Sequence, residues 1–267
     1  MSLLEGQIAI VTGGGRGLGR ALAETLAGLG ASVVLCSRNA PQLDEVVKEI
    51  KRSGGRALAH AADVADERQV RDLVLSTERW VGPATILVNN ASVLDPVAPL
   101  ARSDATQWLR SMAINVGGVY LVTRAVLPGM LERGYGRIVN ISSGAARRPS
   151  AGWTSYCAAK SAVDQLTRAL AIELEGTGVT ACSFAPGLMD TGMQERIRRA
   201  SAEDFPRVEE FREAHRSGRV RDPREPARTI AYLASPEASF NGEILEQDDE
   251  ELARRVSAAL GSPASSG

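Results

Sequence analysis

The sequence predicts an α/β protein built on a doubly wound, seven-stranded parallel sheet with helices on both faces. Strand-like and helix-like segments alternate along the chain, a glycine-rich turn joins the first strand to the first helix, and 267 residues suffice for one large domain. Strands that are joined through helices pair in parallel, and the right-handed crossover rule then favours the doubly wound arrangement.

Seven segments have the character of strands. They are short, apolar and rich in β-branched residues, and turn residues bound most of them. They span 7–12, 32–37, 56–64, 85–90, 136–142, 178–187 and 242–247.

Helical periodicity fills the segments between these strands. Leucines recur at helical spacing in 17–30, and 41–55 begins with a proline and ends in glycines. Amphipathic stretches follow near 66–80 and 104–131, and a long helix is expected near 153–176.

We expect a single domain over 1–255. Within it, residues 188–222 are arginine-rich and interrupted by glycine and proline after a strand end, which predicts a lid over a site. Residues 256–267 are small and polar toward their end and are expected to form a flexible tail.

The bulk properties exclude several classes of protein. A net charge of -1 and a pI near 6.2 give no basic excess for nucleic acid or an acidic membrane surface. The start of the chain lacks a signal-peptide pattern, and no apolar run reaches the roughly 18 residues of a membrane span. Three cysteines and two histidines, widely spaced, argue against disulfides, a metal site and a Ser-His-Asp triad, so a cytoplasmic protein is expected.

The turn "TGGGRGLG" carries Gly13, Gly17 and Gly19 between the first strand and the first helix. Its spacing is G-x-x-x-G-x-G rather than G-x-G-x-x-G, but glycines still let the backbone approach a pyrophosphate at a helix N-terminus. A tight turn can also bind nothing. Its place in the first strand–helix unit favours a dinucleotide.

The end of the second strand indicates which dinucleotide. An NAD site carries an acid about 20 residues on, but here Ser37 and Arg38 stand in "CSRN", and Arg16 lies in the glycine loop. Two guanidinium groups would bind a 2′-phosphate, so the sequence favours NADP. The alternative is that both arginines are solvated.

Tyr156 and Lys160 in "YCAAK" are four residues apart, on one helical face. A neighbouring ammonium favours a phenolate, which would suit proton transfer. By itself, the pair could equally lie on the surface.

Taken in order, "TGGGRGLG", "DV" at 63–64, "NNAS" at 89–92, Asn115, "ISS" at 141–143, "YCAAK" and "PGLMDT" resemble the short-chain dehydrogenase/reductase family over roughly residues 5–245. The resemblance implies a Rossmann fold and an oxidoreductase that uses a nicotinamide cofactor.

The resemblance implies four catalytic residues. Tyr156 would exchange the proton, Ser143 would hold the carbonyl oxygen, and Asn115 would hold a water in the relay. Ser143 is preferred to Ser142 because it stands 13 residues before Tyr156. Lys160, together with a positively charged nicotinamide, would lower the pKa of Tyr156 from its usual value near 10 toward neutrality.

The resemblance also implies the cofactor-binding and substrate-binding residues. Asp63 would bind the adenine amino group, beside Val64, and Thr191 would bind the carboxamide. The cofactor set comprises Gly13, Gly15, Arg16, Gly17, Leu18, Gly19, Ser37, Arg38, Asp63, Val64, Asn89, Ala91, Tyr156, Lys160, Pro186, Gly187 and Thr191.

The expected substrate-binding residues are Ser143, Ala145, Trp153, Tyr156, Leu188 and Met193. Trp153 could instead pack the start of the long helix. The pocket is expected to be apolar with few charges, which suits a ketone or diketone.

The C-terminal region departs from the family pattern. Its acidic run from Asp248 to Glu251 would repel its own symmetry copy in a standard tetramer, which argues against that tetramer. A homo-oligomer is still expected, either a homodimer or a homotetramer. This ending resembles sepiapterin reductase and bacterial benzil reductases. In the sepiapterin enzymes an acid near the C-terminus anchors the pterin, and the resemblance implies that Asp249 matches this acid. The alternative is a solvated acidic turn.

Three functions are considered. The first is NADPH-dependent reduction of a ketone or diketone. The second is 3-oxoacyl-[acyl-carrier-protein] reduction, with Arg147 and Arg148 as a basic patch for the carrier. The third is a non-catalytic NADP(H) sensor, which is disfavoured because Asn115, Ser143, Tyr156 and Lys160 are all present.

Overall fold

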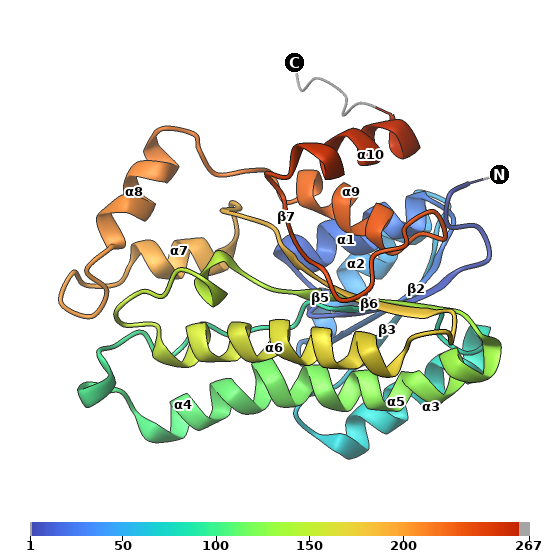
Figure 1. The fold of residues 1–267 in the computed structure, drawn as a ribbon, viewed down its shortest axis with the longest axis horizontal. Helices are drawn as coiled ribbons and strands as arrows, with labels where there is room; N and C mark the ends of the chain where they lie inside the picture. Colours follow the sequence, from blue (N-terminus) through green and yellow to red (C-terminus); the bar gives the residue numbers. More distant parts are fainter. Residues whose placement is uncertain (1, 262–267) are drawn as a thin grey trace.

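A parallel sheet of seven strands, in the order β3-β2-β1-β4-β5-β6-β7, forms the centre of the computed structural model, which describes residues 2–261 (Figure 1). This confirms the predicted fold class. The order reverses between β1 and β4, where doubly wound sheets bind their ligands. The strands are β1 (Ile8–Thr12), β2 (Ser32–Ser37), β3 (Arg56–Ala61), β4 (Ile86–Asn89), β5 (Gly136–Ile141), β6 (Val179–Ala185) and β7 (Ile244–Glu246).

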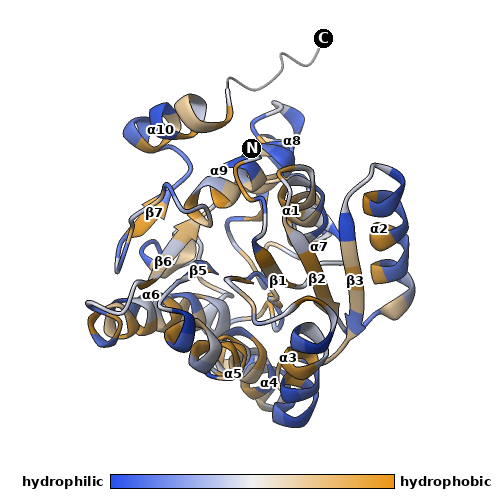
Figure 2. Ribbon diagram, turned by 90° about the vertical axis from the view of Figure 1, so that its right-hand side faces the viewer, coloured by the Kyte–Doolittle hydropathy of each residue, from blue (hydrophilic) through white to orange (hydrophobic). Residues whose placement is uncertain are grey.

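Helices cover both faces of the sheet (Figures 1 and 2). Alternate residues of β1 point to opposite sides, so that Val11 joins one core and Ile10 the other. One face packs α1 (Gly17–Gly28), α2 (Ala40–Arg52), α9 (Arg224–Leu233) and α10 (Glu250–Leu260). The opposite face packs α3 (Glu67–Val81), α5 (Gly118–Arg133) and α6 (Thr154–Glu173), and α4 (Ala105–Met112) lies against α6.

Three of the differences between the observed and the predicted boundaries affect the site or the end of the chain. Strand β3 ends at Ala61, so Asp63 and Val64 lie in the loop that follows it. The helical stretch expected over 104–131 contains a π-helical turn, Ala113–Gly117, between α4 and α5. Helix α10 continues through Leu260 and buries Val256, so the predicted tail is wrong for 256–260, and its residues 262–267 lie outside the described part.

Within the described residues, one continuous helical segment, Ala105–Arg133, is long and apolar enough to cross a membrane by length and composition alone. Core helices of soluble proteins pass the same test. Here α5 packs on α3, α4 packs on α6, and 44% of the apolar window is buried, which indicates a core helix.

The predicted lid carries two helices, α7 (Gly192–Arg198) and α8 (Val208–Arg216). They project beyond the carboxyl ends of the strands, next to the start of α6 (Figure 1). A third apolar cluster joins them to the rest of the molecule, and it includes Trp153 and Tyr156 of the α6 region with Phe205 and Phe211 of the lid.

The three cysteines, Cys36, Cys157 and Cys182, are free and buried. Burial raises the pKa of the Cys36 and Cys182 thiols to about 12. Cys157 belongs to the aromatic cluster next to Tyr156.

Candidate active site

A cavity of about 1220 Å³ opens at the carboxyl ends of the strands. It runs from the glycine loop after β1, past the ends of β4 and β5, to the inner surface of the lid. Among the described residues, no group of histidine, cysteine, aspartate and glutamate side chains could hold a metal ion.

The glycine loop is shaped by close backbone contacts. Gly13 and Gly17 have φ of 67° and 53°, a region that favours glycine. A Cβ at Gly19 would lie 2.1 Å from the Gly13 carbonyl oxygen. Asn90 donates from its side chain to the carbonyl oxygens of Thr12 (2.8 Å) and Gly13 (3.2 Å). The loop is therefore held in one conformation by its own backbone contacts and by Asn90.

The lid begins against this loop. A Cβ at Gly17 would lie 3.3 Å from the Thr191 methyl carbon, and Thr191 is the residue before α7. Thr191, Pro186 and Gly187 all line the cavity, and their predicted contacts with the nicotinamide stay predictions.

Ser37, Arg38 and Arg16 also line the cavity, at the end of β2 and on the glycine loop. Neither arginine forms an ion pair within the described part of the chain. Two guanidinium groups without acidic partners beside a glycine loop fit a phosphate on the adenosine ribose.

Asp63 lines the cavity but is already engaged by the protein. Its carboxylate pairs with Arg110 and accepts from the Ala65 amide at 3.0 Å. Val64 lies behind it, against Gly118.

The structure moves one predicted cofactor residue out of the cavity. The Asn89 side chain is 4% exposed and donates to Thr123 Oγ1 (3.0 Å) and Asn140 Oδ1 (2.8 Å) beneath the sheet end. Asn89 does not line the cavity, so its predicted place there is wrong; the neighbouring Asn90, which was not predicted, lines the cavity together with the predicted Ala91. The reason is the alternation at the end of β4, which turns Asn89 inward.

Tyr156 is buried at the centre of the cavity, with the hydroxyl groups of Ser143 and Ser92 beside it. Burial raises its pKa to about 12, because the charged phenolate is desolvated, and the hydroxyl groups of Ser143 and Ser92 act in the opposite direction. The expected lowering requires Lys160 and a positively charged nicotinamide together, and it stays a prediction; the protein side chains by themselves raise this pKa.

Lys160 lies close to the Tyr156 ring but is buried as well. Its Nζ lies 5.6 Å from the centre of the Tyr156 ring and donates to the Ile141 carbonyl oxygen at 2.7 Å. Burial lowers the pKa of Lys160 to about 8, partly offset by Asp164 one helical turn further on. A desolvated ammonium is itself costly, so it does not make the phenol acidic without further positive charge.

Asn115 lies in the π-helical turn and binds the loop after β4. Its Oδ1 accepts from the Val93 amide (2.8 Å) and Ser92 Oγ (3.0 Å), while Nδ2 donates to the Val93 carbonyl oxygen (2.8 Å). Ser92 thus connects Asn115 to Tyr156. Ser92 lies in the motif "NNAS", but the motif does not indicate this role, because the role depends on the contact with Asn115.

The substrate end of the cavity is lined by the aromatic cluster. Trp153 stacks on Phe205, with ring centroids 4.4 Å apart, and meets Tyr156 edge-on at 5.9 Å. Trp153 thus packs the start of α6 and also lines the cavity, and its contact with a substrate stays a prediction. Ala145, Leu188 and Met193 line the cavity too.

Several residues at this end were not predicted. They come from segments far apart in the sequence, so no local spacing indicates them: Leu94, Arg148, Gln194 and Phe211. Gln194 is 5% exposed, and its side-chain oxygen has no hydrogen-bond partner among the described residues.

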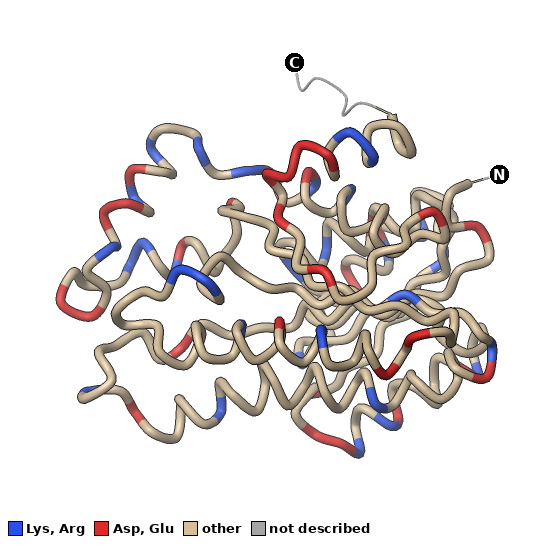
Figure 3. Tube along the Cα trace, in the orientation of Figure 1, with Lys and Arg blue, Asp and Glu red and all other residues tan. Residues whose placement is uncertain are grey.

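Arginine, aspartate and glutamate side chains line the cavity, so the expected pocket with few charges is wrong. Figure 3 shows how charged residues are spread along the segments of the chain, including α7 and α8. Most of the charged side chains that line the cavity are paired. Arg207 binds Glu210 at 2.7 Å, and Arg221 binds both Asp248 and Glu225.

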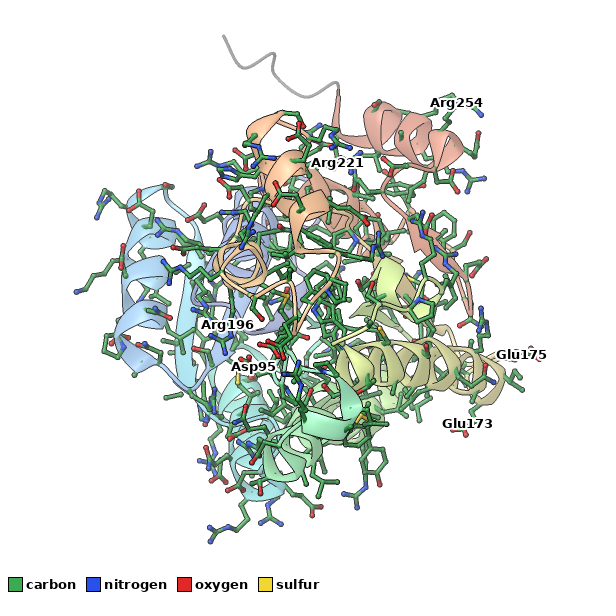
Figure 4. All side chains as sticks on the ribbon, turned by 90° about the vertical axis from the view of Figure 1, so that its left-hand side faces the viewer. Asp95, Glu173, Glu175, Arg196, Arg221 and Arg254 are labelled. Atoms are coloured by element: carbon green, nitrogen blue, oxygen red, sulfur yellow. The ribbon has the colours of Figure 1, made fainter. Side chains whose placement is uncertain are left out.

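A further ion pair ties the lid to the loop after β4. Arg196 Nε donates to both carboxylate oxygens of Asp95 at 2.8 Å, and the two side chains lie together in Figure 4. Ion pairs therefore join the lid to the loop after β4 through Asp95 and to the segment after β7 through Asp248.

The C-terminal acids have local partners. Asp249 caps α10 by accepting from the Leu252 amide at 2.9 Å, and it does not line the cavity. The predicted pterin-anchor position is thus wrong for Asp249. Asp248 lines the cavity instead, paired with Arg221.

A family model described as short chain dehydrogenase matches residues 7–202. The chain belongs to this family. As a short-chain dehydrogenase, it is an oxidoreductase, in agreement with the resemblance of its motifs.

Known short-chain dehydrogenases are similar over nearly the whole chain. A 3-oxoacyl-[acyl-carrier-protein] reductase of Vibrio harveyi is 34% identical over 91% of this chain and 96% of its own. A levodione reductase structure has a TM-score of 0.85 at 30% identity, covering 94% and 99%. The NADPH complex of an actinorhodin polyketide ketoreductase variant has a TM-score of 0.83 at 33% identity, covering 92% and 97%.

Proposed function

We propose that this short-chain dehydrogenase reduces a ketone or diketone carbonyl to an alcohol with NADPH. The observation that carries the proposal is one cavity that joins the glycine loop, the unpaired Arg16 and Arg38, and the hydroxyl groups of Tyr156 and Ser143. The similarity to a ketoreductase solved with NADPH supports the same cofactor.

The residues at the nucleotide end fit NADPH. The glycine loop, which has no room for a Cβ at Gly19, would bind the pyrophosphate at the start of α1, and Arg16 and Arg38 would hold the 2′-phosphate. When bound, NADPH supplies the hydride.

At the substrate end, Ser143 would hold the carbonyl oxygen and Tyr156 would protonate it. Carbon gains the hydride with its electron pair, the C=O π bond breaks, and the phenolic proton goes to oxygen. A pKa near 12 keeps Tyr156 protonated and ready to donate at neutral pH. Lys160 would move from the Ile141 carbonyl to the nicotinamide ribose, which its single flexible amine permits.

Substitution of Tyr156 by phenylalanine tests the chemistry. It removes the proton donor but keeps the ring contacts with Trp153, so kcat for a ketone should fall by about 10²–10⁴-fold with NADPH affinity nearly unchanged. Initial rates of NADPH oxidation and a fluorescence titration of NADPH give the two numbers. Near-normal turnover would contradict the assignment.

Substitution Arg38→Asp tests the cofactor. An acid at this position repels a 2′-phosphate and accepts from a 2′-hydroxyl, so NADPH affinity should fall by about 100-fold while NADH affinity is kept or improved. Titrations of both cofactors measure this, with Arg52→Asp, a remote exposed arginine on α2, as the control. Unchanged NADPH affinity would contradict the NADP preference.

Reduction of a 3-oxoacyl thioester is a second candidate, favoured by the relative from Vibrio harveyi. The structure weakens the basic patch considered for the carrier protein, since Arg147 pairs with Glu246. Rates with a panel of ketones, diketones and acetoacetyl thioesters separate the two candidates. A non-catalytic sensor would oxidise NADPH with none of them.

Assembly and location remain proposals. Helices α4, α5 and α6 expose Leu109, Tyr120 and Ile172, which supports a homodimer or homotetramer. The mass in solution distinguishes these states. The similarity to sepiapterin and benzil reductases and the cytoplasmic location stay predictions.

A further inference from the structure

Six arginines line the cavity, and their partners divide them into groups. Arg207 and Arg221 are neutralised by ion pairs, and Arg219 donates to the Ser217 hydroxyl. Arg16 and Arg38 lie at the nucleotide end. The sixth, Arg148, has no acidic partner within the part of the chain that the structure describes.

Arg148 lies close to the reacting groups. Its Nη2 is 3.7 Å from the position of a Cβ on Gly144, and Gly144 directly follows Ser143. Standard backbone dimensions therefore place this nitrogen within about 9 Å of the Ser143 Cα. Both Gly144 and Arg148 line the cavity, so the guanidinium lies on the same side of the cavity as Ser143, a few bond lengths from where a substrate carbonyl would bind.

The neighbouring Arg147 has a different environment. Arg147 pairs with Glu246 of β7 and does not line the cavity. Two adjacent arginines thus have different environments: Arg147 is neutralised by an acid of the protein, whereas Arg148 is exposed, lines the cavity and has no acidic partner among the described residues.

We propose that Arg148 binds a carboxylate of the substrate, and that the enzyme therefore acts on oxo acids whose carboxylate lies a few bonds from the reacting carbonyl. The inference rests on the proposed function and specifies its substrate class. A planar guanidinium binds a carboxylate through two parallel hydrogen bonds, which would also orient the carbonyl toward Tyr156 and Ser143.

The apolar residues around Arg148 limit the shape of this substrate. Ala145 and Trp153 line the same end of the cavity, so the carbons between carboxylate and carbonyl would contact apolar surface. The phosphate of a carrier-protein arm does not fit this position, because the long pantetheine arm separates it from the thioester carbonyl.

The experiment compares oxo acids with their methyl esters, using the full chain and NADPH. The probes are 3-oxobutanoate, 4-oxopentanoate and 5-oxohexanoate, each with its ester, and kcat/KM is measured for every pair. The wild type should prefer at least one acid over its ester. Arg148→Gln should lower kcat/KM for that acid by about 10- to 100-fold and change the ester by less than about threefold.

Two variants serve as controls. Arg147→Gln should leave both substrates within about twofold, and Arg148→Lys should recover part of the preference for the acid, because it restores the charge without the planar fork. Thermal unfolding of each variant checks that the fold is kept, as expected for an exposed side chain.

The outcomes distinguish a failure of the carboxylate site from a failure of the proposed reductase function. If the wild type reduces the esters as well as the acids, or if Arg148→Gln lowers both equally, the carboxylate site is refuted while the reductase stands. If neither acids nor esters oxidise NADPH, while other ketones do, the oxo-acid class is refuted. If no carbonyl compound is reduced, the proposed function fails and the inference fails with it.

Discussion

The glycine loop and the lid face each other across one cavity, but the loop is shaped by backbone contacts and the lid is held by side chains. At Gly19 there is no room for a Cβ, since a backbone oxygen lies 2.1 Å from its position. The lid instead stacks Phe205 on Trp153 and binds Asp95 through Arg196.

This difference separates binding of the cofactor, which the members of a family share, from the choice of substrate, which differs between individual enzymes. Backbone contacts recognise the part of the ligand common to all members, the pyrophosphate, and require glycine at set spacings. Side chains of the lid and of the loops opposite it can change without disturbing the sheet, so they are suited to choosing a substrate.

The largest expected effect tests whether the lid is packed as firmly as a core. Phe205 is fully buried, so Phe205→Ala should lower the free energy of unfolding by about 3–5 kcal/mol. Urea unfolding followed by circular dichroism measures the loss. Leu188→Ala, at a side chain that is 36% exposed, is the control and should cost less than about 1 kcal/mol. A loss below about 1 kcal/mol for Phe205→Ala would show that the lid opens independently.

The next effect concerns the backbone end of the cavity. Gly19→Ala forces the loop away from Gly13, so NADPH affinity should fall by about 100-fold, as measured by fluorescence titration. Gly28→Ala, at the end of the same helix with no atom within 4 Å of its Cβ position, should leave the affinity unchanged. Equal affinities of the two variants would contradict a loop shaped by backbone contact.

The smallest effect is the pH dependence of stability that the buried Lys160 causes. Because burial lowers the folded-state pKa of Lys160 to about 8 from 10.5, its charge destabilises the fold below pH 8, and this cost is relieved as the pH rises toward 10.5. The stability of the wild type relative to Lys160→Met should therefore rise by roughly 2 kcal/mol between pH 8 and 10. Parallel stability curves for the two proteins would disprove it.

The sheet, the glycine loop and the Tyr156–Lys160 pair could be predicted because each depends on local spacing. Period-two and helical patterns mark the strands and helices, and a four-residue step puts Tyr156 and Lys160 on one face of α6. The departures were local as well: Asn89 turns inward at a strand end, and a π-helical turn interrupts the helix at Asn115.

The substrate end could not be predicted in the same way. Phe205 meets Trp153 across about fifty residues of sequence, and Asp95 meets Arg196 across 101. The burial of Lys160, which sets its pKa, also depends on packing that no spacing encodes. Tertiary contact decides these features, whereas the family motifs indicate only the groups that take part in the chemistry.

The buried cysteines give each end of the molecule its own reporter. A thiol with a pKa near 12 is almost never a thiolate at neutral pH, so Cys36 is unreactive in the folded protein. Because Cys36 is fully buried, alkylating reagents and peroxide reach it only when the sheet opens. Cys157, inside the aromatic cluster, becomes accessible only when that cluster separates. Labelling rates at the two cysteines would therefore time the opening of each end in the unaltered protein.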